Sequence, residues 1–249
     1  MTQSVRVLGI LKADSVNPDL QVTHGDYTDM FQSIFRVADP TLTFNIYDVL
    51  ASQYPDNINE CDGYLITGSR HSVYEPLPWI QRLGEFVVEL HSARKKLVGI
   101  CFGHQLVAHV LGGRTAKSDR GWGVGRHVTR LYDASHPDWP SEFALLSSHQ
   151  DQVQEPPPDA EIIAQSDFCP IAGMTLGQHI LTLQGHPEFT KDYARDLLGV
   201  RREVLGESLY QAGLASLAED VHQLEVARLI LDFLFDGPSA GALSAQVPK

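Results

Sequence analysis

One stretch of the chain, residues 96–113 (KLVGICFGHQLVAHVLGG), predicts a strand, a sharp turn and a helix in immediate succession. Leu97, Val98 and Ile100 form a short apolar run typical of a buried parallel strand. After Gly103 the apolar residues recur at helical spacing until a pair of glycines ends the helix. A strand followed at once by a helix constrains this part of the chain to a βα unit.

The turn itself reads Gly99-Ile100-Cys101-Phe102-Gly103, a nucleophile elbow with Cys where the hydrolase form has Ser. The flanking glycines let backbones pass close to a strained turn. Such a turn places the Cys101 thiol at the carboxyl edge of a sheet and at a helix N-terminus, where the helix dipole favours the thiolate. It also aims the Phe102 backbone N–H at a developing oxyanion. The alternative, a buried core thiol, does not predict glycines on both sides.

The first half of the chain alternates strands with helices. Besides the elbow strand, strands are expected at residues 5–11, 42–49 and 62–67. A loop over residues 12–26 precedes a helix marked by apolar side chains near position 30, and Pro78 opens another helix. This alternation predicts an α/β protein with parallel βαβ units, helices on both faces of an open sheet, and a site at the carboxyl ends of the strands.

The pattern changes after the elbow helix. Residues 128–131, 143–146 and 161–164 resemble antiparallel strands, and Pro156-Pro157-Pro158 is expected to be a surface connector between two of them. Glycines at 121, 123 and 125 lack the spacing of a dinucleotide fingerprint, so they indicate strand and loop geometry and no NAD site. A last apolar strand, HILTLQ, covers residues 179–184, and helices close the chain.

Length and composition limit the classes of function. A chain of 249 residues can form one α/β domain, and we expect that domain over residues 1–238 with a flexible tail at 239–249. No apolar run is long enough to span a bilayer and no secretion signal is evident, which predicts a soluble, cytoplasmic protein. The formal net charge of −12 disfavours nucleic acid and anionic membranes as partners. The cysteines, Cys61, Cys101 and Cys169, fit neither a disulfide framework nor a metal cluster.

A second motif supplies the groups that a thiol nucleophile requires. The last strand runs directly into Gly185-His186-Pro187-Glu188-Phe189. A nucleophilic thiol needs a base, and the base needs an acceptor on its other ring nitrogen. At a spacing of two after a strand, His186 and Glu188 can point the same way, so Glu188 can orient the His186 ring.

Taken together, ICFGHQ and QGHPEF resemble the class I glutamine amidotransferase family, and matching landmarks cover roughly residues 40–195. The resemblance implies a flavodoxin-like three-layer α/β/α sandwich whose mainly parallel central sheet carries a small antiparallel addition. It also implies that Cys101 is the nucleophile, His186 the general base and acid, and Glu188 the residue that orients His186. No metal or organic cofactor is implied.

The resemblance extends to substrate-binding positions. Gln105 matches the family position that contacts the glutamyl group, and residues 147–151 resemble the S-H-x-D segment that receives the α-amino and α-carboxylate ends of the substrate. Within that segment, the resemblance implies that the substrate is bound by Ser148, His149 and Gln150. The alternative for this segment is a polar strand-to-loop turn.

The second oxyanion donor of the family comes from a Gly-Gly-Pro loop after the third strand. Here the loop reads Thr67-Gly68-Ser69-Arg70-His71, so the donor is the N–H of Gly68 or Ser69. Arg70 and His71 are expected to line the pocket mouth or to lie in a solvated loop. At the pocket mouth, Arg70 would bind a carboxylate of a larger leaving group through a charge-assisted hydrogen bond. Loops of this type are associated with stand-alone members that resemble γ-glutamyl peptidases and amidotransferases similar to GMP synthase.

The reaction implied is hydrolysis of a γ-glutamyl amide, from glutamine or a larger γ-glutamyl compound, through a thioester on Cys101. Because no ATP-pyrophosphatase or Walker signature follows, we expect a stand-alone hydrolase acting on a small-molecule substrate. The alternative is a glutaminase subunit that delivers ammonia to a separately encoded synthetase. A non-catalytic binding module is a third hypothesis. The sequence does not decide the leaving amine or the oligomeric state.

Overall fold

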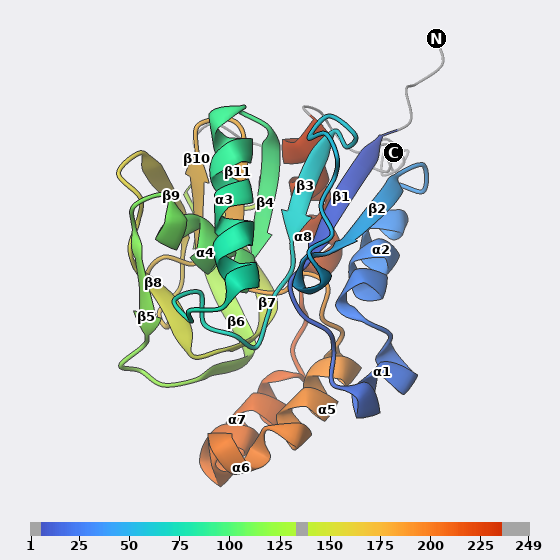
Figure 1. The fold of residues 1–249 in the computed structure, drawn as a ribbon. Coiled ribbons are helices and arrows are strands. Elements are labelled where there is room, and N and C mark those ends of the chain that lie inside the picture. Colours follow the sequence, from blue (N-terminus) through green and yellow to red (C-terminus); the bar gives the residue numbers. More distant parts are fainter. Residues whose placement is uncertain (1–5, 133–138, 236–249) are drawn as a thin grey trace, which may run out of the picture.

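A nine-stranded mixed sheet forms the centre of the computed structural model, which describes residues 6–132 and 139–235 (Figure 1). Its strand order is β2-β1-β3-β4-β11-β10-β9-β6-β7. The first five strands in this order run parallel, and the other four join antiparallel. The strands are β1 (Val7–Lys12), β2 (Thr43–Asp48), β3 (Gly63–Ile66), β4 (Lys96–Ile100), β6 (Gly123–Leu131), β7 (Glu142–His149), β9 (Ala160–Gln165), β10 (Gly173–Leu176) and β11 (Ile180–Leu183). A separate antiparallel pair consists of β5 (Arg114–Lys117) and β8 (Asp151–Glu155).

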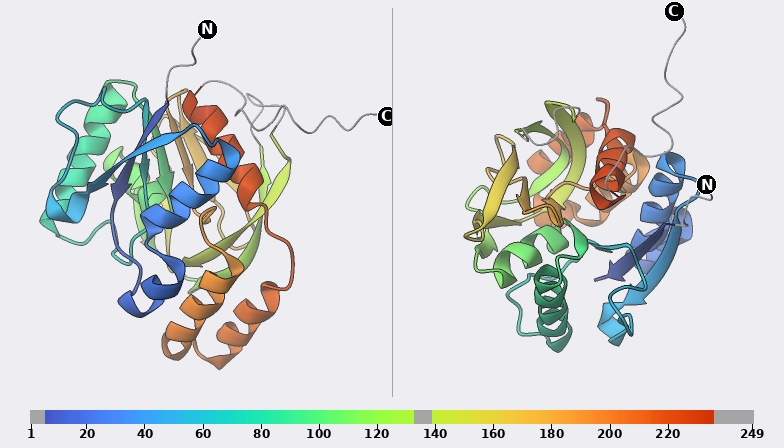
Figure 2. Two further views of the ribbon diagram at one scale, coloured as in Figure 1. Left: turned by 90° about the vertical axis from the view of Figure 1, so that its right-hand side faces the viewer. Right: turned by 90° about the horizontal axis from the view of Figure 1, so that it is seen from above.

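Helices cover both faces of the parallel half (Figure 2). On one face α2 and α8 pack together over β1 and β4, and on the other α3 packs against α4. A third group, α5 to α7, lies beyond one end of the sheet, where α7 contacts β6 and α5 contacts α1 (Figure 1). The helices are α1 (Pro18–His24), α2 (Tyr27–Ala38), α3 (Pro78–Ser92), α4 (Phe102–Val110), α5 (Lys191–Val200), α6 (Arg202–Leu205), α7 (Glu207–Ser216) and α8 (Gln223–Phe235), with a short 3₁₀ turn, η1 (Val49–Ala51).

The α/β fold expected from the sequence is confirmed: a large, mostly parallel sheet lies between layers of helices. The strand order of the parallel half, β2-β1-β3-β4-β11, is that of flavodoxin-like folds. The antiparallel strands expected after the elbow helix join one edge of the same sheet. The tail expected at 239–249 lies outside the described residues.

The loop expected over residues 12–26 is wrong in part, because it contains helix α1. The Asn17 side chain caps the helix and Pro18 occupies its first turn, two favourable start signals. None of the residues of α1 is buried, so the sequence has no apolar periodicity there to reveal a helix. The short strands β5, β8 and β10 were not expected either.

The turn from β4 to α4 has the strained geometry that the glycine spacing predicts. Cys101 has φ 52° and ψ −97°, a left-handed backbone conformation that is uncommon for a residue with a side chain. A Cβ on Gly99 would lie 2.6 Å from the Gly103 carbonyl oxygen, and one on Gly103 would lie 2.7 Å from the Ile66 carbonyl oxygen. The two glycines therefore let α4 approach β3 and β4 closely enough to form the turn.

We expect Gly103→Ala to lower the free energy of unfolding by about 1–3 kcal/mol, because its new methyl group meets the Ile66 carbonyl oxygen and the branched Cβ of the same buried residue, neither of which can move aside. Gly199→Ala is the matched control, since this glycine lies in α5 with no atom within 4 Å of an added Cβ. The control should raise the free energy of unfolding by about 0.5–1 kcal/mol. Urea denaturation of both variants measures the difference, and equal stability of the two would contradict the close approach.

Candidate active site

Cys101 lies between the carboxyl end of β4 and the first turn of α4. Its backbone N–H donates to the carbonyl of Leu183 at the end of the neighbouring strand β11, at 2.8 Å, so two parallel strands fix the turn. The sulfur lies against a cavity, although the residue is only 6% exposed. Phe102 begins α4, and helix geometry leaves the N–H of the first helical residue without an intrahelical partner.

His186 and Glu188 follow β11, the strand that pairs with β4. The backbone N–H of His186 donates to the Leu146 carbonyl at 2.9 Å, which ties this segment to β7. The ring Nδ1–H of His186 donates to Glu188 Oε1 at 2.7 Å, and both residues are almost fully buried. The sequence thus brings imidazole and carboxylate together as the spacing of two predicts.

An aromatic cluster holds the His186 ring in place. Phe189 stacks on it with ring centroids 3.8 Å apart and an interplanar angle of 10°. Tyr193 in turn meets Phe189 edge-on at 4.7 Å. Parallel stacking on one face and a hydrogen bond at Nδ1 leave the imidazole little rotational freedom.

The charge around His186 favours its protonated form. Burial by itself would lower the pKa of His186, but the Glu188 carboxylate and the neighbouring Cys101 outweigh burial and raise that pKa to about 10. The second oxygen of Glu188 is buried without a hydrogen-bond partner among the described residues, so the imidazolium is the main group that compensates the carboxylate. An imidazolium beside a thiol is an arrangement that favours the thiolate.

The loop after β3 closes the other side of the thiol. A Cβ on Gly68 would lie 2.9 Å from His186 Cε1 and 3.8 Å from Cys101 Cβ, so only glycine fits between the loop and these two side chains. Gly68 and Ser69 line a small void of about 10 Å³ together with Cys101 and His186. This part of the loop therefore lies close to both Cys101 and His186.

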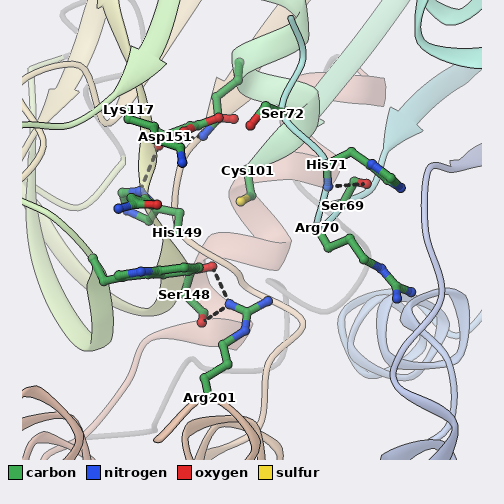
Figure 3. Close-up of a pocket in the computed structure, with 13 residues that line it drawn as sticks. Ser69, Arg70, His71, Ser72, Cys101, Lys117, Ser148, His149, Asp151 and Arg201 are labelled. Atoms are coloured by element: carbon green, nitrogen blue, oxygen red, sulfur yellow. Dashed lines mark hydrogen bonds between the residues drawn. The ribbon is translucent and has the colours of Figure 1, made fainter. Parts of the chain in front are cut away.

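A larger cavity of about 170 Å³ opens beside Cys101 (Figure 3). Of the residues expected to bind substrate, Gln105, Ser148, His149, Gln150 and Arg70 all line it. The remaining lining residues are Ser69, His71, Ser72, Cys101, Lys117, Trp122, Asp151 and Arg201.

The S-H-x-D segment spans the end of β7 and the start of β8. His149 is buried, and burial lowers its pKa to about 3, so it is neutral. Its Nδ1–H donates to the Asp151 carbonyl at 3.0 Å, since a carbonyl can only accept. The Gln105 amide also donates to that carbonyl, at 2.8 Å. These two bonds fix the backbone that carries the Asp151 carboxylate to the cavity wall.

Arg70 lines the cavity as expected, and its guanidinium pairs with a carboxylate of the protein itself. Its guanidinium binds both oxygens of the buried Asp14, with Nη2 2.7 Å from Oδ1 and Nε 2.8 Å from Oδ2. The Arg70 backbone N–H also donates to Asp14, at 2.8 Å, and Nη2 donates to the Ser15 carbonyl. Figure 3 shows the side chain extending away from Cys101, and its pairing with Asp14 holds the loop after β3 to the end of β1.

Two cations in the cavity wall were not singled out from the sequence: Lys117 and Arg201. Lys117 ends β5 and pairs with Asp151 in the ladder of β5 and β8. Arg201 directly follows α5 as its capping residue, and the only signal for it is a helix that begins directly after the His186 motif. Nothing in the local sequence indicates that this helix brings Arg201 back to the cavity.

Metal and membrane features are not evident in the described part of the chain. Across residues 6–132 and 139–235, no group of three His, Cys, Asp or Glu side chains is arranged to hold a metal ion. None of the helices in those ranges is both long and apolar enough to cross a bilayer.

The fold belongs to the class of α/β proteins with a mainly parallel central sheet, and a thiol stands in a strained strand-to-helix turn at the carboxyl edge of that sheet. The chain belongs to the class-I glutamine amidotransferase family, which it matches over residues 30–197. This membership supports an enzyme that hydrolyses glutamine-type amides.

The relatives of this chain include γ-glutamyl peptidases and GMP synthases. Gamma-glutamyl peptidase 3 of Arabidopsis thaliana is 32% identical over 180 residues, which cover 68% of this chain and 72% of that protein. GMP synthase of Thermomicrobium roseum is 32% identical over 171 residues, covering 64% of this chain but 31% of the synthase. Among solved structures, a glutamine amidotransferase from Thermotoga maritima shares the fold with a TM-score of 0.71 at 19% identity, covering 93% of this chain and 96% of that one.

We expect Arg70→Ala to lower the free energy of unfolding by about 1–2 kcal/mol, because it leaves a buried carboxylate without its cation while the guanidinium itself is partly solvated. Burial would raise the pKa of Asp14, but the Arg70 hydrogen bonds outweigh it and lower that pKa below its ordinary value. The stabilisation is therefore fully present above the ordinary pKa of an aspartate and is lost as the pH falls through the lowered pKa of Asp14.

Urea titrations of the parent and the variant at several pH values measure this difference. Arg114→Ala is the control, since it removes an arginine paired with Glu155 where both side chains are exposed. That loss should be about 0.5 kcal/mol or less. An Arg70→Ala variant as stable as the control at neutral pH would show that the Asp14 contact does not hold the loop.

Proposed function

We propose that the chain is a thiol-dependent γ-glutamyl hydrolase that acts without a partner subunit. The observation that carries this proposal is the convergence of Cys101, His186 and Glu188 beside a cavity in which Asp151 and Lys117 form one part of the wall. A γ-glutamyl group ends in an ammonium and a carboxylate, and the wall offers one group of each opposite charge.

In the proposed reaction the Cys101 thiolate attacks the γ-carbonyl carbon, and the carbonyl electrons move to oxygen. When the tetrahedral intermediate collapses, the C–N bond breaks and His186 gives its proton to the departing amine. The product is a γ-glutamyl thioester on Cys101. Water then loses a proton to His186 and attacks the thioester, which releases glutamate and restores the thiolate and imidazolium.

The groups around Cys101 can stabilise the negative charges that form in this reaction, first on the sulfur and then on the substrate oxygen. The protonated His186, stabilised by Glu188, favours the thiolate before attack and supplies the proton for the amine. The N–H groups of Phe102 and of Gly68 or Ser69 are the proposed oxyanion donors, and donors of this kind typically contribute about 3–4 kcal/mol each to transition-state stabilisation. No step requires a metal or organic cofactor.

Asp151 is the proposed partner of the substrate's α-ammonium group, and Lys117 of its α-carboxylate. The two residues are register partners in adjacent strands, so their side chains share one part of the cavity wall. Tyr74 donates its hydroxyl to Asp151 Oδ1 at 3.2 Å, which orients the carboxylate. Gln105 and His149 act on this wall through the Asp151 carbonyl.

The relatives bear on whether the chain acts alone. It covers 72% of a gamma-glutamyl peptidase, which supports a self-sufficient hydrolase. The alternative, a glutaminase subunit that docks on a synthetase, is favoured by the match to one part of a GMP synthase. The two differ in substrate: a subunit uses glutamine and responds to its synthetase, whereas a hydrolase accepts larger leaving amines without any partner.

The test is glutamate release by the purified chain from glutamine and from γ-glutamyl dipeptides. We expect release without added protein, and Cys101→Ala should reduce it at least about a thousandfold. Cys169→Ala is the matched control, because burial raises the pKa of that thiol to about 12 and should leave it unreactive. Activity in Cys101→Ala within tenfold of the parent would exclude the thioester route, and a requirement for a synthetase would favour the subunit.

A further inference from the structure

Arg201 is a cation of the cavity whose observed partners are all neutral. Its guanidinium donates to the Ser148 hydroxyl and, at 3.1 Å, to the Ser148 carbonyl, and it lies 5.2 Å from the centre of the Trp122 ring. No carboxylate of the described residues lies within ion-pair distance of it, in contrast to Arg70 with Asp14. Figure 3 shows the Arg201 guanidinium pointing into the cavity toward Cys101.

The position of Arg201 separates it from the proposed glutamyl site. Lys117 and Asp151 line the larger cavity only, whereas Arg201 lines both this cavity and the small void next to His186. Because His186 is the proposed donor of a proton to the departing amine, the amine must lie on the side of Cys101 that faces His186. Arg201 is the cation on that side.

We propose that Arg201 is a specificity-determining residue that binds a carboxylate carried by the leaving group. This inference rests on the proposed hydrolysis and names the preferred substrate class, γ-glutamyl amino acids and peptides, rather than glutamine or simple γ-glutamyl amines. A planar guanidinium held by Ser148 on one edge and by an aromatic face can still offer its remaining N–H groups to a carboxylate.

The local structure supports a fixed cation rather than a mobile surface arginine. Arg201 joins α5 to α6, and its backbone N–H donates to carbonyls at the end of α5. Ser148 lies in the segment that leads to Asp151, so one stretch of backbone positions both Arg201 and the proposed ammonium partner. The distance between the two recognition sites is therefore set by the fold.

The experiment compares two substrates that differ in one charge: γ-glutamyl-alanine, whose leaving group bears a carboxylate, and γ-glutamyl-alaninamide, whose leaving group is neutral. For the parent and for Arg201→Gln, kcat and KM are measured on both. We expect Arg201→Gln to lower the ratio of kcat/KM between the charged and the neutral substrate by about ten- to a hundredfold, the size of effect typical of a lost charge-assisted hydrogen bond. Arg201→Lys should recover part of that ratio, since it keeps the charge but not the planar fork.

Arg195→Gln is the matched control, because it removes an exposed arginine of the same helix that pairs with Asp192 outside the cavity. Its substrate ratio should equal that of the parent. An equal loss of kcat/KM on both substrates in Arg201→Gln would mean that Arg201 binds the glutamyl part or supports the fold. Unchanged kcat/KM on both substrates would mean that it binds neither part, and both results overturn the inference. Failure of the parent to hydrolyse either substrate would instead overturn the proposed function on which the inference rests.

Discussion

The close approach of α4 to β3 and β4 is the constraint on which the candidate site depends. Where Gly99 and Gly103 stand, any side chain would press on backbone atoms less than 3 Å away. Without that approach the strained backbone of Cys101 would not form, and the sulfur would not lie at the sheet edge beside the loop of Gly68. The parallel pairing of β4 with β11 then places His186 close to Cys101, because the two strands end side by side and His186 follows β11.

The charged residues in and around the cavity differ in the kind of partner that each one has. His186 with Glu188 is a buried pair, and such a pair is weak evidence for stability because removing two charges from water is costly. Its aromatic cover and the orphaned carboxylate oxygen agree with a function in charge placement. Arg70 with Asp14 is a structural pair that holds a loop. Arg201 faces the cavity with neutral partners, which leaves its charge for a ligand.

How much could be predicted from the sequence depended on how local the signal was. The elbow and the His186 motif are each set by a few adjacent residues at a strand end, so their positions followed from spacing. The role of Arg70 did not, because its partner Asp14 lies far away in the chain at the end of another strand. Arg201 was missed for a similar reason, because only the packing of α5 beyond the sheet end brings it to the cavity. Helix α1 was missed for a different reason: it has no buried face that would produce a periodic apolar pattern.

The central claim is that Glu188 keeps His186 protonated beside Cys101 at neutral pH. The most direct test is an NMR titration of the His186 ring nitrogens in the parent and in Glu188→Gln, with the neutral, buried His104 as internal reference, because burial lowers its pKa to about 4. We expect His186 to hold its proton until about pH 10 in the parent, and to lose the proton at a distinctly lower pH in the variant. Titration of His186 near 6.5 in the parent, or the same midpoint in both proteins, would contradict the claim.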